Sequence, residues 1–165
     1  MGAWFRLLII RTFRLDRAQL CIKSFIKEQP AMGQRYVEPV TDTLPSIYEE
    51  MVPTIPVIFL LSVGADPTEG IMQLCRKKKS SCHAISMGEG QRAPALEALA
   101  VAQEQGTWVL LQNCELGLDL MVDMEDYMKK NKFNEAFRLF ITAAPEKMFP
   151  LGLLQMSTKV TNEPP

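Results

Sequence analysis

Four short blocks along the chain predict strands, and the first is typical of a strand buried on both faces of a sheet. They span Val57–Val63, Cys82–Met87, Trp108–Asn113 and Phe137–Thr142. Helical spacing separates them, first at Ile71, Leu74 and Cys75, then over Pro94–Gln105, then from Leu120 to Met128. Because strands and helices alternate at short intervals, the pattern predicts an α/β fold in which a parallel sheet is sandwiched by helices.

The first third of the chain follows a different pattern. Residues 4–28 have helical apolar spacing with a break near Leu15, and Asp16 is a candidate cap for a second helix. Residues 34–56 are polar and rich in proline, with room for a short helix around Ser46–Met51. The sequence therefore predicts a helical segment at about 4–56 and a sheet-and-helix core at about 57–165, together forming one domain.

Composition excludes several classes of protein. The chain has 165 residues, 47% hydrophobic and 22% charged, with a formal net charge of -1. That balance argues against a protein devoted to nucleic acid, which needs a basic excess. No apolar run is long enough to span a bilayer, and Arg6 and Arg11 interrupt the N-terminal apolar stretch, so we expect neither membrane partner nor signal peptide.

Cysteine and histidine do not form a metal-binding pattern. The four cysteines are Cys21, Cys75, Cys82 and Cys114, and none forms a C-x-x-C pair. Reduced, buried thiols are the simplest interpretation. His83 is the only histidine and lies in a predicted strand, so we expect a structural role for it and no metal site.

The glycine-bounded segment after the first strand has the layout of a phosphate-binding loop, because a strand precedes it and a helix follows. A working loop reads G-x-x-x-x-G-K-[ST], with the lysine on the outer phosphates and the hydroxyl on magnesium. Here Gly64 and Gly70 are one residue too far apart, Ile71 stands in place of the lysine, and Met72 stands in place of the hydroxyl residue. The loop therefore lacks both of these ligands.

The same loop is acidic. Asp66, Pro67 and Glu69 fit the N-cap, first and third positions of a helix, with Thr68 between them. This spacing predicts a capping box, in which Asp66 accepts from first-turn amides and Glu69 reaches back to the N-cap. Those amides are the donors that a phosphate would use, so the sequence predicts a helix satisfied by its own carboxylates.

Hydrolysis also requires a carboxylate at the end of a neighbouring strand to position magnesium. The candidate strand ends in Gln112 and Asn113, and amides cannot supply that charge. We therefore expect no catalytic residue and no cofactor in this segment of the chain.

A second glycine signal supports an alternative function. The motif residues are Gly88, Gly90 and Ala93, in the pattern G-x-G-x-x-[GA] between a strand and a helix. That pattern is typical of an NAD-dependent oxidoreductase, which also needs an acid at the end of the next strand. A divergent NTPase is the other form of this alternative, with Arg92 or Arg138 as the substitute cation. A tight turn into a helix is the simpler interpretation of the motif.

Six segments are informative when taken together: Pro56–Thr68, Met87–Gln91, Trp108–Cys114, Phe137–Leu139, Lys159–Pro165 and, near the start, Phe13–Arg17. Together they resemble the sixth AAA+ module of dynein heavy chains, with an axonemal character. Leu15, Glu89 and Glu115 depart from the family's usual residues. The resemblance covers nearly the whole chain in the family's order.

The resemblance implies a P-loop NTPase-like AAA+ large subdomain whose helical lid would begin beyond Pro165. It implies a non-catalytic ring module of a microtubule motor, with ATP and magnesium bound in other modules. The implied partners are neighbouring AAA+ modules and, through the parent motor, microtubules and dynein intermediate and light chains. The implied location is the cytoplasmic cytoskeleton, in the axoneme of a cilium.

Overall fold

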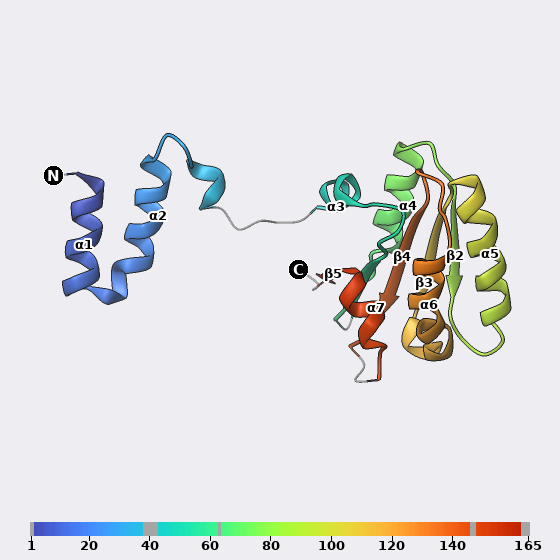
Figure 1. Cartoon of the computed structure of the whole chain (residues 1–165). Helices are drawn as coiled ribbons and strands as arrows, with labels where there is room; N and C mark the ends of the chain where they lie inside the picture. Colours follow the sequence, from blue (N-terminus) through green and yellow to red (C-terminus); the bar gives the residue numbers. More distant parts are fainter. Residues whose placement is uncertain (1, 38–42, 63, 146–147, 163–165) are drawn as a thin grey trace. The chain divides into compact units, whose positions relative to one another are not determined.

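A sheet of five parallel strands, in the order β2-β3-β4-β1-β5, forms the centre of the fold (Figure 1). The strands are β1 (Val57–Leu61), β2 (Cys82–Ser86), β3 (Trp108–Gln112), β4 (Arg138–Ala143) and β5 (Thr158–Asn162). Val57 pairs with Phe140 on one side and with Thr158 on the other. Because all strands run the same way, their carboxyl ends meet at one edge of the sheet, where ligands bind in open α/β sheets.

Helices cover both faces of the sheet, as the sequence pattern predicts. They are α3 (Leu44–Glu50), α4 (Thr68–Lys77), α5 (Arg92–Gln105), α6 (Leu118–Lys130) and α7 (Leu151–Met156), with a 3-10 turn η3 at Cys114–Leu116. Alternate strand residues divide between two cores, so Ile58 packs in the cluster of α5, α6 and α7, whereas Phe59 packs in the cluster of α3 and α4. Buried methionines fill the first cluster at Met121, Met124 and Met128.

The structure is a computed structural model that describes residues 2–37, 43–62, 64–145 and 148–162. It separates into two compact units, residues 1–42 and 43–165. Helix α3 belongs to the second unit, because Ile47 and Met51 are buried in the same cluster as Trp108. The predicted boundary near residue 56, between a helical segment and the sheet-and-helix core, stays a prediction, as does the expectation that both belong to one functional domain.

The first unit is a pair of helices, α1 (Ala3–Phe13) and α2 (Ala18–Glu28), with 3-10 turns η1 (Leu15–Arg17) and η2 (Gln34–Tyr36). The predicted break near Leu15 is confirmed, but the predicted cap is wrong. Asp16 lies in η1 and accepts hydrogen bonds from Arg14 at 2.8 and 3.1 Å, while α2 begins at Ala18 without a side-chain cap. The Asp16 carboxylate therefore binds the Arg14 guanidinium and does not cap α2.

Two elements near the end of the chain have no counterpart among the elements predicted from apolar spacing. Helix α7 has only six residues, too few to establish a helical period, and only Leu153 in it is buried. Strand β5 is an edge strand whose residues are polar except for Val160, which is its contact with the core. Val63 and residues 163–165 of the predicted patterns lie outside the described residues.

The thiols agree with the prediction that they are reduced and largely buried. Cys21, Cys75 and Cys114 are buried, Cys82 is partly buried, and all four are free. Burial raises the pKa of the Cys75 and Cys114 thiols above the ordinary range. His83 lies in β2, as predicted, and its side chain is exposed.

Candidate functional site

The loop between β1 and α4 lies at the carboxyl edge of the sheet, where a P-loop protein would hold its phosphates. The amide of Ala65 donates to the carbonyl of Ser62 at 3.0 Å, which closes a tight turn. Gly64 sits in this turn with a φ of 86°, a left-handed conformation that favours glycine. The strand, turn and helix predicted from the sequence are thus in place.

The loop is shorter than the glycine-bounded segment, because α4 begins at Thr68, one residue after the start that the capping pattern predicts. Gly70 therefore lies inside the helix rather than at the end of the turn. A Cβ atom on Gly70 would lie 2.6 Å from the Cδ1 atom of Leu44 in α3. This glycine lets two helices approach closely, which is a packing role and not a phosphate-binding one.

The predicted capping box is wrong, because the N-cap of α4 is Pro67 and it makes no side-chain cap bond, but Asp66, one residue earlier, does accept from a first-turn amide as expected. Asp66 Oδ1 accepts a hydrogen bond from the Thr68 amide at 2.9 Å. Glu69 does not reach back; its carboxylate accepts from the Gln73 side chain at 3.1 Å, one turn further along the helix. Two carboxylates therefore lie at the start of α4, and of these Asp66 is bonded to a first-turn amide whereas Glu69 is bonded to a side chain.

A hydrogen-bond chain crosses the site from β3 to this carboxylate. Gln112, at the end of β3, donates from Nε2 to Thr68 Oγ1 at 2.7 Å. The hydroxyl and amide of Thr68 both donate to Asp66, and these bonds hold the pKa of that carboxyl below its usual range. The residue at the strand end, where a hydrolase needs a carboxylate, is thus an amide engaged with the loop helix.

Polar side chains link the other strand ends at the same edge. Asn113 adopts a left-handed φ of 53° and donates from its side chain to Ser86 Oγ at 2.9 Å. The backbone amide of Asn113 donates to the buried Thr142 hydroxyl at 3.3 Å. The carboxylate of Glu115 accepts from the Ala144 amide at 3.0 Å. These bonds join the ends of β2, β3 and β4 without a ligand.

The structure places the residues that stand where a working phosphate loop has its ligands. Ile71 is fully buried against β1 and β3 residues, so its side chain belongs to the core and not to the loop surface. Gln112 is half-buried and Asn113 is exposed at the sheet edge. An apolar side chain cannot neutralise a phosphate, and a neutral amide cannot replace a magnesium-positioning carboxylate.

Neither substitute cation lies at the loop. Arg92, at the start of α5, forms ion pairs with Asp119 and Asp123 of α6. Arg138 begins β4 and therefore lies at the amino edge of the sheet, where its guanidinium sits 5.2 Å from the centre of the Tyr48 ring. Gly90 has a φ of 79° in the turn into α5, and this turn follows the edge strand β2. The second glycine motif thus has the geometry of a tight turn.

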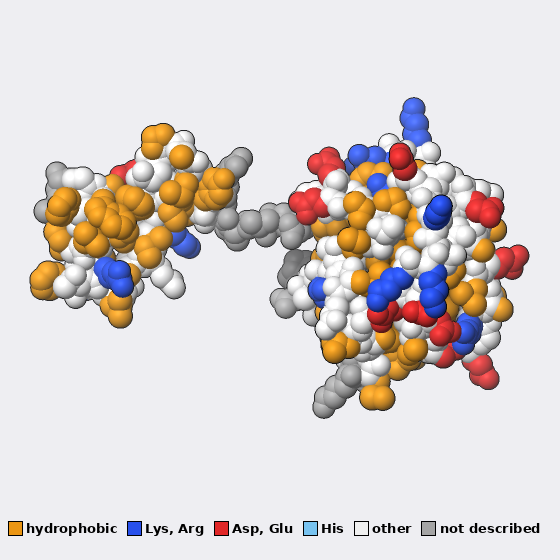
Figure 2. Space-filling model, in the orientation of Figure 1, with side chains coloured by type: hydrophobic (Ala, Val, Ile, Leu, Met, Phe, Trp, Pro, Cys, Tyr) orange, Lys and Arg blue, Asp and Glu red, His pale blue; other side chains and the backbone are white. Residues whose placement is uncertain are grey.

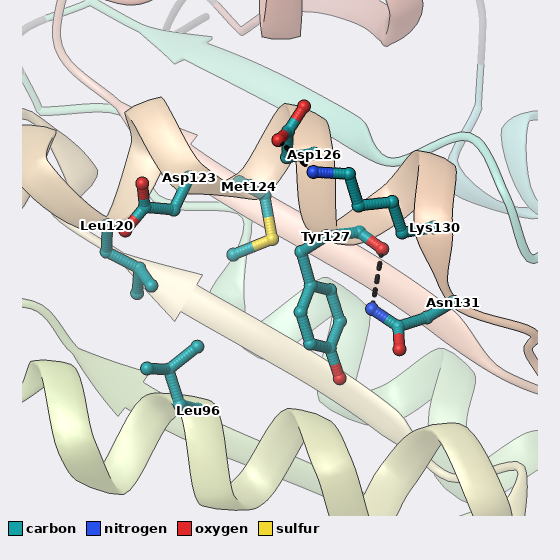
Figure 3. Close-up of a pocket in the computed structure, with 8 residues that line it drawn as sticks. All are labelled: Leu96, Leu120, Asp123, Met124, Asp126, Tyr127, Lys130 and Asn131. Carbon is teal, nitrogen blue, oxygen red and sulfur yellow. Dashed lines mark hydrogen bonds and ion pairs between the residues drawn. The ribbon is translucent and has the colours of Figure 1, made fainter.

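A separate hollow of about 330 Å³ lies between α5 and α6 (Figure 3). Leu96 from α5 and Leu120, Met124 and Tyr127 from α6 form its largely apolar lining. At its rim, Lys130 pairs with Asp126, and the Asn131 side chain donates to the Tyr127 carbonyl at 2.9 Å. These polar groups are already partnered, so the hollow offers space for an apolar group but no catalytic pair.

The described residues were also compared with the requirements for a metal site and for a membrane-spanning helix. Among them, no group of three or more His, Cys, Asp or Glu side chains is placed to hold a metal ion. No helix within 2–37, 43–62, 64–145 or 148–162 has both the length and the apolar character needed to cross a membrane.

Sequence reasoning found the two strand-end amides but missed their partners. The sequence places Thr68 in the degenerate phosphate loop but indicates no partner for it, and it assigns Ser86 and Thr142 to strands without a site role. The sequence does contain one signal: polar residues lie at the last or next-to-last position of three consecutive predicted strands, and parallel strand ends meet at one edge. Which of these groups touch depends on strand order, and the sequence pattern does not show that order.

A solved structure shares the fold. The chain superposes on a chain in the structure of the E. coli MS115-1 HORMA:CdnC:Trip13 complex with a TM-score of 0.51 at 10% sequence identity, covering 92% of this chain and 63% of that one. At that identity the likeness concerns the fold alone.

Sequence comparisons are more specific. The family model described as "Dynein heavy chain region D6 P-loop domain" matches residues 52–161. The chain is 43% identical over 164 residues to the dynein gamma chain of the flagellar outer arm of Chlamydomonas reinhardtii. It is 40% identical over 161 residues to dynein axonemal heavy chain 8 of Homo sapiens. Each alignment covers 97% of this chain but only 4% of the relative's length. With its five-stranded parallel sheet and P-loop topology, the chain belongs to the dynein heavy chain family, as an α/β AAA+ P-loop module.

Proposed function

We propose that this chain is a non-catalytic module of a dynein motor ring, in which the phosphate site is held closed by the protein's own side chains. The observation on which the proposal chiefly depends is the bond from Gln112 to Thr68, which joins the end of β3 to the start of α4. In a hydrolytic site those two positions face a nucleotide and its magnesium ion.

Electrostatics support the same proposal. Asp66 keeps a negative charge at the helix N-terminus, and hydrogen bonds from Thr68 lower its pKa. A polyphosphate at this position would lose the Thr68 amide as a donor and would meet a like charge. Binding would thus require the loop to give up bonds that it already makes.

The proposed role in the whole motor is structural. A parallel sheet packed on both faces moves as a rigid body, so it transmits shifts between neighbouring AAA+ modules of the heavy chain. The flagellar and axonemal names of the relatives support a location in the axoneme of a cilium. ATP hydrolysis, microtubule binding and contacts with intermediate and light chains would then belong to other parts of the motor.

A thermal melt of the purified chain with and without Mg-ATP or Mg-ADP tests the proposal. A ligand present at about 100 times its Kd adds about 2.7 kcal/mol to the stability of the native state. For a domain of this size that raises Tm by several degrees. We expect no shift beyond that seen with magnesium and inorganic phosphate at the same ionic strength, which is the control for general salt effects.

The alternative is a nucleotide-binding enzyme, and the same melt separates it from the proposal. A clear rise in Tm with Mg-ATP would mean that the Gln112–Thr68 bond opens and that the loop is a live nucleotide site. A rise with NAD in its place would assign the turn at Gly88 and Gly90 to a dinucleotide. Either result would overturn the structural role.

A further inference from the structure

A second hollow, of about 590 Å³, lies at the amino edge of the sheet, opposite the phosphate loop. It is bounded by the carboxyl end of α4, the carboxyl end of α5 and one residue of α3. Its lining residues are Tyr48, Lys78, Lys79, Ser80, Ser81, Gln105, Gly106, Thr107, Trp108 and Ala136. Its volume falls within the range of ligand-binding pockets.

The lining is positively charged. It contains the ammonium groups of Lys78 and Lys79 and, among its ten residues, no carboxylate. Arg76 and Lys77 directly precede them at the end of α4 and are exposed. A helix C-terminus has about half a negative charge, so four adjacent cations exceed what the α4 dipole requires. The surplus charge would attract an anion.

Several hydrogen-bond donors in the hollow are free, whereas the carbonyls of Ala102, Gln103 and Glu104 near the end of α5 are occupied. Within the described residues, the Lys79 ammonium and the Ser80 and Ser81 hydroxyls have no protein partner. The last carbonyls of α5 accept from Gly106, Thr107 and Asn134. Donors without partners beside satisfied carbonyls favour a ligand that accepts hydrogen bonds.

Backbone conformation at Lys79 adds an independent observation. Lys79 has a φ of 56°, in the left-handed region that glycine usually occupies after a helix. Its amide donates to the Arg76 carbonyl, and the next amide, of Ser80, donates to Cys75, which completes a Schellman-type helix end. The chain thus places a lysine where a glycine would be less strained, which is expected where the ammonium itself is used.

Aromatic stacking, by contrast, is not offered to a nucleotide base. The Tyr48 ring already has the Lys78 ammonium 4.8 Å and the Arg138 guanidinium 5.2 Å from its centre. The Trp108 ring lies 5.0 Å from it and is buried. Nucleic acids and nucleotides are commonly bound by exposed aromatic faces together with cations, and here the faces are covered.

From these observations we propose that this hollow binds an acidic polypeptide segment, with neighbouring Asp or Glu carboxylates on Lys78 and Lys79. Carboxylates would accept from both ammonium groups and from the Ser80 and Ser81 hydroxyls. The exposed Arg76 and Lys77 would extend the contact along a run of acids. The site stands at the edge opposite the phosphate loop, so it does not depend on whether a nucleotide binds there.

Fluorescence anisotropy with the full chain tests this site. The probe is a fluorescein-labelled peptide of alternating Glu and Gly, compared with the same peptide containing Gln in place of Glu. We expect saturable binding of the acidic peptide alone, weakened by added salt because the contacts are exposed. The double substitution Lys78→Gln with Lys79→Gln should weaken binding about tenfold.

A matched control removes the same charge elsewhere. Lys129 and Lys130 are also adjacent lysines at a helix C-terminus, and Lys129→Gln with Lys130→Gln should leave binding unchanged. The single substitution Lys79→Gly removes one ammonium while relieving the left-handed strain, so it should weaken binding in a chain at least as stable. Equal binding by both double variants, no binding of the acidic peptide, or tighter binding of pyrophosphate or an oligonucleotide would overturn the proposal.

Discussion

At the scale of single residues, the polar groups of the phosphate loop contact one another. Thr68 receives a bond from Gln112 and gives bonds to Asp66, so one side chain joins β3 to the helix cap. Asp66 is exposed, so it stabilises the fold through its hydrogen bond with the Thr68 amide and not as a buried charge. Removal of this carboxylate should therefore affect the stability of α4 directly.

Asp66→Ala should lower the free energy of unfolding by about 1 kcal/mol, because the Thr68 amide loses its acceptor and the start of α4 loses a negative charge. Glu69→Ala should change it by less than about 0.5 kcal/mol, because Glu69 contacts Gln73 on the helix surface and not the cap. Urea unfolding of both variants measures the difference. The stability that Asp66 contributes should depend on pH. Because its pKa is lowered in the folded state, the contribution is present near neutral pH and is lost as the pH falls into the acid range. An equal loss in both variants would mean that Glu69 also stabilises the start of α4.

Ionisation of the Cys82 thiol should lower the stability of the fold at alkaline pH. Burial, with a smaller effect of Cys75, raises the pKa of the Cys82 thiol from 9.0 to about 12. A raised pKa stabilises the fold fully below the unfolded value, and that contribution is lost as pH rises from about 9 towards 12. Urea midpoints should fall over this range, and less steeply in Cys82→Ala. A variant with the same slope as the parent chain would contradict this assignment.

At the scale of helices and strands, long periodic segments were predictable and local contacts were not. The apolar blocks at Val57 and Trp108 became central strands because burial on both faces demands continuous apolar sequence. Asp16 and Glu69 found other partners than predicted because an arginine and a glutamine lie within reach. Strand β5 has too little apolar sequence to signal itself, and its place depends on pairing with β1.

Gly106 is a glycine whose role the sequence does reveal, because it follows the last residue of α5. It adopts a φ of 73°, and an added Cβ would lie 2.6 Å from the Asn134 side chain, which binds the end of the helix. Gly106→Ala should therefore lower the free energy of unfolding by about 1–2 kcal/mol. Gly88→Ala is the matched control, since its φ is not in the left-handed region and its Cβ would meet open space. A similar loss at Gly88 in urea unfolding would point to a hidden constraint in that turn.

At the scale of the whole molecule, the two units differ in how they bury apolar side chains. The buried residues of the two cores in the second unit all lie between Ile47 and Leu153. In the first unit, α1 buries no residue and α2 buries only Cys21. Phe13 and Leu15 are 79% and 76% exposed, and Figure 2 shows apolar side chains over much of the visible face of this unit. Surface of this kind marks interaction sites in soluble proteins.

A chain that begins at Thr43 should fold without the first unit. Its Tm should stay within a few degrees of the full chain, because no core contact of the second unit is removed. Binding of the dye ANS and light scattering at high concentration should both fall, because the exposed apolar helices are gone. The double substitution Phe13→Ser with Leu15→Ser in the full chain is the control, and it should reduce ANS binding while leaving the Tm of the sheet unit unchanged. A truncated chain that fails to fold would show that the helical pair completes the core, and undiminished ANS binding would place the interaction surface on the sheet unit.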